Sequence, residues 1–278
     1  MRIDFHTHTF PEKIAGAALS KLSAMSHTAP FTLGTDEDLR RSMKTAGIDL
    51  SVVLPVATNP EKISHINQVS LEKTGKEGLI CFGCVHPDSE NALEELERVS
   101  AMGLRGIKIH PVYQGVDIDD PRFLRILEKA GALDLVVVMH AGDDIGFPGV
   151  VRCSPEQTRR ALIQVRGVKL VLAHMGGWQN WERVAENLAD TDVYLDTSFS
   201  LGRVPLLPGE TSPFSAELLS SEDFCSLVRS FGSHRVLFGS DSPWTDQKAS
   251  LEDILNLPLT WEEKECVLGK NAERLLRL

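Results

Sequence analysis

Eight short runs of apolar, often β-branched residues recur along the chain. Each run is nearly continuous in hydrophobicity, which is typical of strands buried on both faces of a parallel sheet, whereas half-exposed strands would alternate. The pattern therefore predicts parallel strands at residues 2–5, 51–56, 79–84, 105–109, 135–139, 169–173, 193–197 and 235–239.

Segments with helical periodicity and recognisable ends separate these strands. They start at N-cap residues, two of which form capping boxes with a Gln or Glu three positions later, and they stop at glycines. The start signals are Thr35, Asp120, Ser154 with Gln157, and Thr260 with Glu263, and the stop signals are Gly47, Gly131 and Gly167. The predicted helices cover residues 35–47, 91–103, 120–131, 154–167, 180–189 and 260–276.

Repeated alternation of strand and helix over 278 residues is the sequence form of an α/β fold, the (β/α)8 TIM barrel. We expect a single domain over residues 1–278. An open doubly wound sheet is the alternative, because strand periodicity does not separate a closed sheet from an open one. Its dinucleotide-binding version is disfavoured, since no G-x-G-x-x-G loop follows the first strand.

Two predicted connections are unusually long, residues 9–34 and residues 198–221. Both follow the C-terminal end of a strand. Because a barrel carries its active site at that end of its strands, we expect these connections to act as lids or specificity loops, and a disordered surface excursion is the alternative.

The excess of acidic over basic residues limits the kinds of molecule that this protein is expected to bind. Lys and Arg together number 29 and Asp and Glu 39, which gives a net charge of -10. This argues against nucleic acid or an anionic membrane as partner, so a small-molecule substrate is expected. We find no apolar stretch of spanning length and no signal-peptide pattern, and we expect a cytoplasmic protein. The sequence does not determine the oligomeric state, and a homo-oligomer is one of the states it allows.

The five cysteines do not suggest a disulfide framework, and reduced thiols are expected. Cys81 and Cys84 have C-x-x-C spacing, but they lie in a predicted strand, where residues three apart point to opposite faces. Packing is therefore favoured over a redox or zinc role for this pair.

Polar residues of metal-binding types interrupt the apolar runs at their C-terminal ends. His6 and His8 are two apart on the first strand, so both point to one face. Other strands end in residues of the same kind, and barrel strands deliver such side chains into a common mouth. The residues in question are His6, His8, Lys108, His110, His140, His174 and Asp241.

A single histidine at a strand end is more often a hydrogen-bonded structural residue than a ligand. Several imidazoles and a carboxylate in one concave site, however, would be costly to desolvate without a cation. Ligands of this kind suit Zn²⁺ or a neighbouring divalent ion. Among the other histidines, we expect His86 to pack structurally or to line the mouth, and His27, His65 and His234 to lie on the surface.

The motifs "DFHTH", "GIKIHP", "MHAG", "AHMGG" and "FGSDSPW", followed by "NAERLL", resemble the amidohydrolase superfamily of metal-dependent barrels. More narrowly, they are similar to the branch that includes aminocarboxymuconate-semialdehyde decarboxylase-like proteins. The match spans essentially the whole chain in the right order. The combination is specific for the superfamily but not for a substrate.

The resemblance implies a site for one divalent ion, usually zinc. The implied ligands are His6, His8, His140 and Asp241. His174 is implied to be catalytic or to polarise the substrate. Some members hold a second ion on a carboxylated lysine at about the position of Lys108, but we favour an uncarboxylated lysine that binds a substrate anion.

The function expected first is that of a hydrolase that uses a metal-activated water to cleave a C–N or C–O bond. The substrate would be an amide, a cyclic amide or a lactone of a small, acidic metabolite. Asp241 would act as general base, and His174 would hydrogen-bond the carbonyl oxygen as charge develops there. Asp4 would orient a ligand histidine or form a structural salt bridge. The residues expected to bind substrate are Lys108, His110, Arg152 and Arg203.

Two other functions stay open. A metal-dependent nonoxidative decarboxylase of a small carboxylic acid would use the same ligands. It stands second because decarboxylases of this branch tend to be longer chains and because no motif in this sequence marks their substrate pocket. A barrel that binds a metal or metabolite without turnover stands third. Binding alone would not require both Asp241 and His174 beside the ligands.

Overall fold

The computed structural model describes all 278 residues, and the chain divides into two compact units. Unit 1 combines the two ends of the chain and consists of Met1–Val53, Asp144–Gly149 and Asp196–Leu278. Unit 2 consists of Leu54–Asp143 and Val150–Leu195.

Unit 1 contains three strands, six α-helices, one 3₁₀ turn and one π turn. In chain order they are β1 (Ile3–Thr7), α1 (Glu12–Ser26), α2 (Asp36–Ala46), β2 (Leu50–Val53), α9 (Ser221–Phe231), the 3₁₀ turn η4 (Ser233–Arg235), β9 (Val236–Leu237), α10 (Gln247–Asn256), α11 (Trp261–Glu265), the π turn η5 (Cys266–Lys270) and α12 (Asn271–Leu276).

The strands of unit 1 run parallel with β1 between its neighbours. On one edge β1 pairs with β2, with Asp4 opposite Ser51. On the other edge the Phe5 N–H donates to the Phe238 carbonyl directly after β9, at 2.7 Å. The pairing continues beyond the strand, where the Asp241 N–H donates to the His6 carbonyl at 2.8 Å. The C-terminal end of β1 is thereby tied to the segment that follows β9.

Unit 2 contains the remaining strands and helices. In chain order they are the 3₁₀ turn η1 (Pro60–Lys62), α3 (Ile63–Lys73), β3 (Leu79–Cys81), β4 (Gly83–Cys84), α4 (Ala92–Ala101), β5 (Gly106–Ile109), α5 (Pro111–Gln114), α6 (Pro121–Ala132), β6 (Val136–Met139), α7 (Pro155–Gln164), β7 (Lys169–Leu172), the 3₁₀ turns η2 (His174–Gly176) and η3 (Trp181–Arg183), α8 (Val184–Leu188) and β8 (Tyr194–Asp196), whose last residue lies in unit 1.

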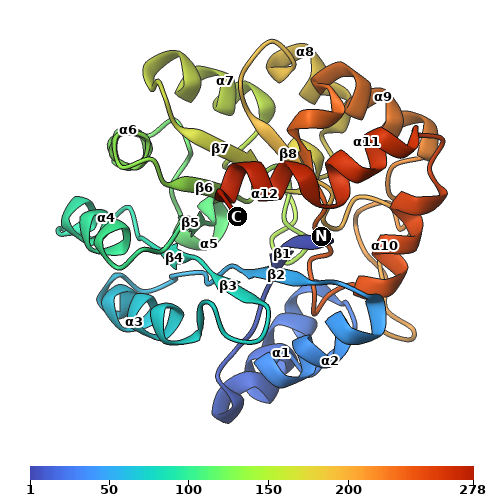
Figure 1. The fold of residues 1–278 in the computed structure, drawn as a ribbon, viewed down its shortest axis with the longest axis horizontal. Coiled ribbons are helices and arrows are strands. Elements are labelled where there is room, and N and C mark those ends of the chain that lie inside the picture. Colours follow the sequence, from blue (N-terminus) through green and yellow to red (C-terminus); the bar gives the residue numbers. More distant parts are fainter. The chain divides into compact units, whose positions relative to one another are not determined.

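The sheet of unit 2 is parallel from β4 through β8, and its strands follow one another in chain order. Figure 1 shows β5, β6 and β7 side by side, with α4, α6 and α7 outside them. All four residues of β5 and all four of β6 are buried, in agreement with strands covered on both faces. Parallel strands in this order bring their C-terminal ends to the same edge of the sheet.

The eight predicted strands are all present, with the run at 79–84 divided into β3 and β4. The helix starts are confirmed too. Thr35 caps α2, with its hydroxyl accepting from the Asp38 N–H, and the capping boxes of Ser154 and Thr260 are both formed. Cys81 and Cys84 are buried, and burial raises the pKa of the Cys84 thiol, which supports packing over redox chemistry.

Three predictions about helices are wrong. The segment 9–34 is not a structureless connection, since it contains α1, which begins after Pro11 without a side-chain cap and buries only Ala15, Leu19 and Ser26. Gly131 does not stop α6 but lies inside it. The predicted continuous helix at 260–276 is divided by the π turn η5, whose Val267 carbonyl accepts from the Phe238 N–H at 2.9 Å.

The second long connection, predicted at residues 198–221, contains no helix before α9 begins at Ser221. Isolated bridges join Leu201 to Leu219 and Arg203 to Glu217 within it. Another bridge joins Leu206 to Thr28, just after α1. A lid or specificity role for this connection stays a prediction. None of the helices is both long enough and apolar enough to cross a membrane.

His86, directly after β4, gives a prediction for stability against pH. The side chain is buried, its Nδ1 accepts from the Asp88 N–H at 3.2 Å, and burial lowers its pKa below the ordinary 6.5, although the Asp88 charge acts in the opposite direction. Below pH 6.5 the unfolded chain takes up a proton at this site before the folded chain does, so the free energy of unfolding should fall as pH falls.

Urea unfolding of the native protein and of His86→Asn, above and below pH 6.5, measures this contribution. Asparagine keeps an acceptor for the Asp88 N–H but does not titrate, so the variant should lose less stability on acidification. The exposed His65 provides the control, because His65→Asn should keep the native pH dependence. Equal pH dependence in His86→Asn and native protein would contradict this account of His86.

Candidate metal centre

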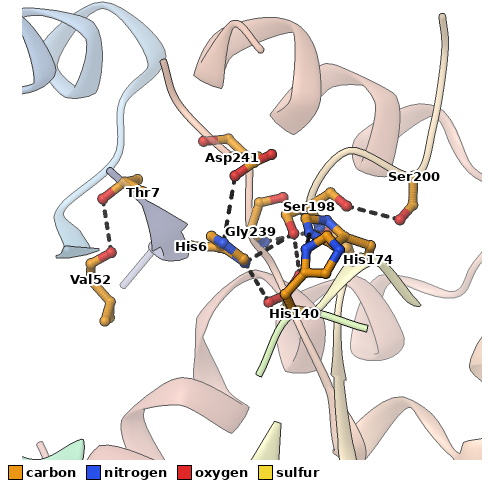
Figure 2. Close-up of polar contacts among 12 residues, drawn as sticks. His6, Thr7, Val52, His140, His174, Ser198, Ser200, Gly239 and Asp241 are labelled. Atoms are coloured by element: carbon orange, nitrogen blue, oxygen red, sulfur yellow. Dashed lines mark hydrogen bonds and ion pairs between the residues drawn. The ribbon is translucent and has the colours of Figure 1, made fainter. Parts of the chain in front are cut away.

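Unit 1 brings three of the predicted ligands together. The Nε2 atoms of His6 and His8 lie 3.2 Å apart, and Asp241 Oδ1 lies 3.5 Å from the first and 3.3 Å from the second. Ligand atoms held about 2.1 Å from one ion lie about 3.0 Å apart at right angles and about 3.4 Å apart at tetrahedral angles. The spacing of the three atoms therefore fits a shared divalent ion, and Figure 2 shows Asp241 above His6.

The local backbone explains how these side chains meet. His6 and His8 point to the same face of β1, and the Asp241 N–H donates to the His6 carbonyl at 2.8 Å. Asp241 has a φ of 71°, a conformation that is uncommon for residues other than glycine and that turns its carboxylate toward the histidines. Strain of this kind is retained where the surrounding structure demands it, often at functional sites.

The second ring nitrogen of His6 has its own buried partners. Its Nδ1 lies 2.7 Å from Asp196 Oδ2 and 3.0 Å from Ser198 Oγ. A carboxylate only accepts hydrogen bonds, so Nδ1 carries the proton in the neutral ring and Nε2 presents its lone pair. Asp196 and Ser198 were not predicted from the sequence. The only signal was the polar "DTS" that ends the run at 193–197.

Asp4 lies one layer below His6 and is fully buried. Burial raises the pKa of Asp4 to about 6, against hydrogen bonds from Gln247, Ser240 and the His6 N–H that act in the opposite direction. Gln247 Nε2 donates to one carboxylate oxygen at 2.7 Å, and the Ser240 N–H donates to the other at 2.9 Å. The carboxylate thus joins β1 to the segment after β9 and to α10, and these hydrogen bonds replace the expected salt bridge.

Unit 2 brings together three other predicted residues. His140 Nδ1 lies 3.1 Å from His174 Nε2, and the ring of His110 stacks on that of His140 with centroids 4.1 Å apart. His140 Nε2 lies 3.0 Å from the Asp143 carbonyl, which can only accept. The neutral His140 ring is therefore protonated on Nε2, and its lone pair is on Nδ1. That lone pair faces His174 Nε2, so the two rings are linked by a hydrogen bond in which His140 Nδ1 accepts.

Two loops of unit 2 hold these rings in place. Asn180 Nδ2 donates to Asp143 Oδ2 at 2.8 Å, which fixes the loop whose carbonyl faces His140. Trp181 Nε1 donates to the His174 carbonyl at 2.9 Å, and His174 itself has a φ of 59°. As with Asp241, an uncommon backbone conformation carries a residue of the predicted site.

Lys108 and His110 share one face of β5 and its continuation. Lys108 is only 1% exposed, which is unusual for a lysine and supports a role for its ammonium group inside the protein. Gln114 secures this strand end, because its Oε1 accepts from the His110 N–H while its Nε2 donates to the Val85 carbonyl at 2.7 Å. That Lys108 is uncarboxylated stays a prediction.

The two predicted substrate-binding arginines have carboxylate partners. Arg152 Nη1 lies 3.0 Å from Asp117 Oδ1, and Arg203 Nε lies 3.1 Å from Glu217 Oε1. A substrate carboxylate would have to displace these partners, and the Arg203 side chain is 70% exposed. Their role in substrate binding stays a prediction. His27 also follows the surface prediction and pairs with Glu210 at 3.0 Å.

Gly239 lies beside His6 and gives a second prediction. A Cβ atom at this position would lie 2.8 Å from the Cβ of His6, closer than real side chains approach. Gly239→Ala should therefore displace His6 and lower the free energy of unfolding by about 1–3 kcal/mol, the usual cost of overpacking. It should also weaken metal binding, because the displaced ring is a predicted ligand.

Gly16 in α1 is the matched control, since a Cβ there would meet nothing within 4 Å. Gly16→Ala should leave metal affinity unchanged and add about 0.5–1 kcal/mol of stability. Denaturant unfolding and metal titration of the two variants compare these effects. Native metal affinity in a folded Gly239→Ala variant would refute the argument about crowding at His6.

Comparison with known proteins identifies the family of this chain and supports its fold. The model of the Amidohydrolase family matches residues 3–278. Comparison with functionally curated proteins finds no match. Among solved structures, an uncharacterised TIM-barrel protein from Bordetella bronchiseptica is similar, with a TM-score of 0.78 and 19% identity, over 99% of this chain and 98% of the other.

Two decarboxylase structures are similar as well. The 5-carboxyvanillate decarboxylase of Sphingomonas paucimobilis has a TM-score of 0.71 and 17% identity, over 100% of this chain and 99% of the other. The 5-carboxyvanillate decarboxylase of Novosphingobium aromaticivorans has a TM-score of 0.74 and 15% identity, over 100% of this chain and 97% of the other. That structure contains bound manganese and 3-methoxy-4-hydroxy-5-nitrobenzoic acid. At such identities the likeness shows the fold, and it confirms the predicted TIM barrel over the doubly wound sheet.

Proposed function

Because the chain belongs to the amidohydrolase family, we propose that it is a metal-dependent carboxy-lyase, which removes the carboxyl group of a small carboxylic acid as CO₂ without oxidation. The observation that carries the proposal is the cluster of His6 Nε2, His8 Nε2 and Asp241 Oδ1, with spacing suited to one divalent ion.

The proposed ligands are His6, His8 and Asp241, and the resemblance to the family implies His140 as a fourth. The donor set of imidazole nitrogens and a carboxylate fits zinc, and it also fits manganese, which one similar structure holds. A bound divalent ion would supply positive charge that holds anionic oxygens of the substrate and stabilises negative charge as it develops.

The remaining roles fall to groups of the chain itself. Nonoxidative decarboxylation breaks the bond between carbon and carboxylate, so a proton must be delivered to the carbon that loses CO₂. Asp241 is the proposed proton donor, which would take a proton from solvent on the oxygen that does not face the ion and pass it to the substrate carbon. Its side chain is 12% exposed and so is reachable, while its backbone is held by His6. His174 would hydrogen-bond a substrate oxygen, and Lys108 and His110 would bind the substrate anion, with Arg152 and Arg203 as further candidates.

Decarboxylation replaces hydrolysis as the preferred reaction for two reasons. Two similar structures carry the name 5-carboxyvanillate decarboxylase. The chain also spans 99% of one of them, so chain length no longer argues against this reaction. Hydrolysis of an amide or lactone is the second candidate, since the family name describes it and Asp241 could accept a proton from water.

One isotope experiment separates the candidates. The protein, loaded with Zn²⁺ or Mn²⁺, is incubated with aromatic and unsaturated carboxylic acids and with lactones and amides, in D₂O and in water labelled with ¹⁸O. A decarboxylase releases CO₂ and places one deuterium on the product carbon, without ¹⁸O in the organic product. A hydrolase places ¹⁸O in the product and releases no CO₂. Metal binding without turnover of any compound would favour the binding barrel and refute the proposal.

A further inference from the structure

The carboxylate of Asp196 lies behind His6 and is completely buried. Its Oδ2 accepts a hydrogen bond from His6 Nδ1 at 2.7 Å. Its Oδ1 accepts two hydrogen bonds, one from the Ser198 N–H at 3.0 Å and one from the Ser198 hydroxyl. The Ser198 oxygen in turn lies 3.0 Å from His6 Nδ1, so Asp196, Ser198 and His6 form a closed triangle of hydrogen bonds, in part visible in Figure 2.

The backbone around this triangle is fixed on both sides. Thr197 Oγ1 accepts from the Gly239 N–H and donates to the Gly239 carbonyl, both at 3.0 Å. Ser200 donates to the Ser198 carbonyl at 2.9 Å. Asp196 and Ser198 are two apart at the end of β8 and face the same way, because Thr197 between them is bound to the neighbouring strand end.

We propose that Asp196 and Ser198 are a positioning pair for His6, which hold its ring in one orientation and in the tautomer that can bind a metal ion. The proposal rests on the metal site of the proposed function and adds two residues that act through His6. Asp196 sets the tautomer, since it accepts the Nδ1 proton and leaves the lone pair on Nε2. Ser198 fixes Asp196 by donating twice to its other oxygen.

Asp196→Asn tests the tautomer directly. The two donors of Ser198 would hold the amide oxygen of asparagine at the position of Oδ1, and the amide NH₂ would then face His6 Nδ1. Nδ1 would have to accept, and the ring proton would move to Nε2, the atom that faces His8 and Asp241. Metal affinity should fall by about 10- to 100-fold, as is typical when the partner of a ligand histidine is replaced.

Two measurements follow the proton and the metal separately. Long-range ¹H–¹⁵N spectra of metal-free protein with ¹⁵N-labelled histidine, at a pH where the rings are neutral, report the tautomer of His6, whose signals are assigned by their loss in His6→Gln. Competition with a chromogenic chelator gives the dissociation constants of Zn²⁺ and Mn²⁺. The native protein should carry the proton on Nδ1, and Asp196→Asn should carry it on Nε2 and bind both ions more weakly.

The exposed Asp192 supplies the control, since Asp192→Asn should match the native protein in both measurements. If Asp196→Asn does not fold, Ser198→Ala takes its place, and its affinity should fall roughly tenfold while the proton stays on Nδ1. A native His6 protonated on Nε2, or a folded Asp196→Asn with native metal affinity, would overturn the proposal. Neither measurement uses turnover, so absence of decarboxylation would refute the proposed function alone.

Discussion

Replacing Asp241 by asparagine is expected to lower kcat/KM by about 10²- to 10⁴-fold, the range for a positioned acid or base. Asparagine has nearly the same shape and keeps one oxygen that can face the ion, but it has no proton to deliver to the substrate carbon. The measurement is the initial rate of CO₂ release from the acid that the isotope experiment identifies.

The matched control for this prediction is Asp192→Asn, at an exposed position. It should retain native kcat/KM. Metal content of the Asp241→Asn preparation must be measured alongside, because loss of the ion would also lower the rate. A metal-loaded Asp241→Asn variant with native kcat/KM would remove Asp241 from the reaction and leave it as a ligand at most.

Replacing His6 or His8 by glutamine is expected to raise the dissociation constant of Zn²⁺ or Mn²⁺ by more than about 100-fold. The loss should exceed the 10- to 100-fold effect of changing a residue that only supports a ligand, since a ligand atom itself is removed. An ion at 100 times its native dissociation constant stabilises the native protein by about 2.7 kcal/mol, and after a 100-fold loss of affinity the same concentration gives about 0.4 kcal/mol.

Denaturant unfolding with and without the ion measures this loss for each variant. His27→Gln is the control, because His27 lies at the surface, paired with Glu210. It should keep the full metal-dependent stabilisation. Equal stabilisation of His8→Gln and native protein would show that the ion binds elsewhere.

The strands and the helices α2, α4, α6 and α7 could be predicted from the sequence because their signals are local, whereas α3, α9 and α10 were not predicted. Continuous apolar runs such as that at 135–139 have few alternatives to a buried strand, and Ser154 and Thr260 carry their capping partners within the next three residues. Helix α1 lacks such a signal, since it has no side-chain cap and buries few residues, so it was missed. The π turn at 266–270 accepts a hydrogen bond from Phe238, 29 positions before Val267, and such a contact leaves no local trace in the sequence.

Some residues of the candidate site could likewise be predicted from local sequence signals, and others could not. The proximity of His6 and His8 could be predicted because strand geometry places them on one face, and Asp241 could be predicted as their neighbour because it ends an apolar run. Asp196 could not, because an aspartate at a strand end is common and only its distance to His6 gives it a role. The carboxylate partners of Arg152 and Arg203 lie 35 and 14 positions away in sequence, respectively, so their ion pairs had no sequence signal either.

The central claim is that His6, His8 and Asp241 hold one divalent ion. Anomalous X-ray diffraction from crystals of the metal-loaded protein tests it most directly, at the absorption edges of zinc and manganese. We predict an anomalous peak about 2.0 to 2.3 Å from the Nε2 atoms of His6 and His8 and from an oxygen of Asp241. A fully loaded protein with its ion at any other place would contradict the claim.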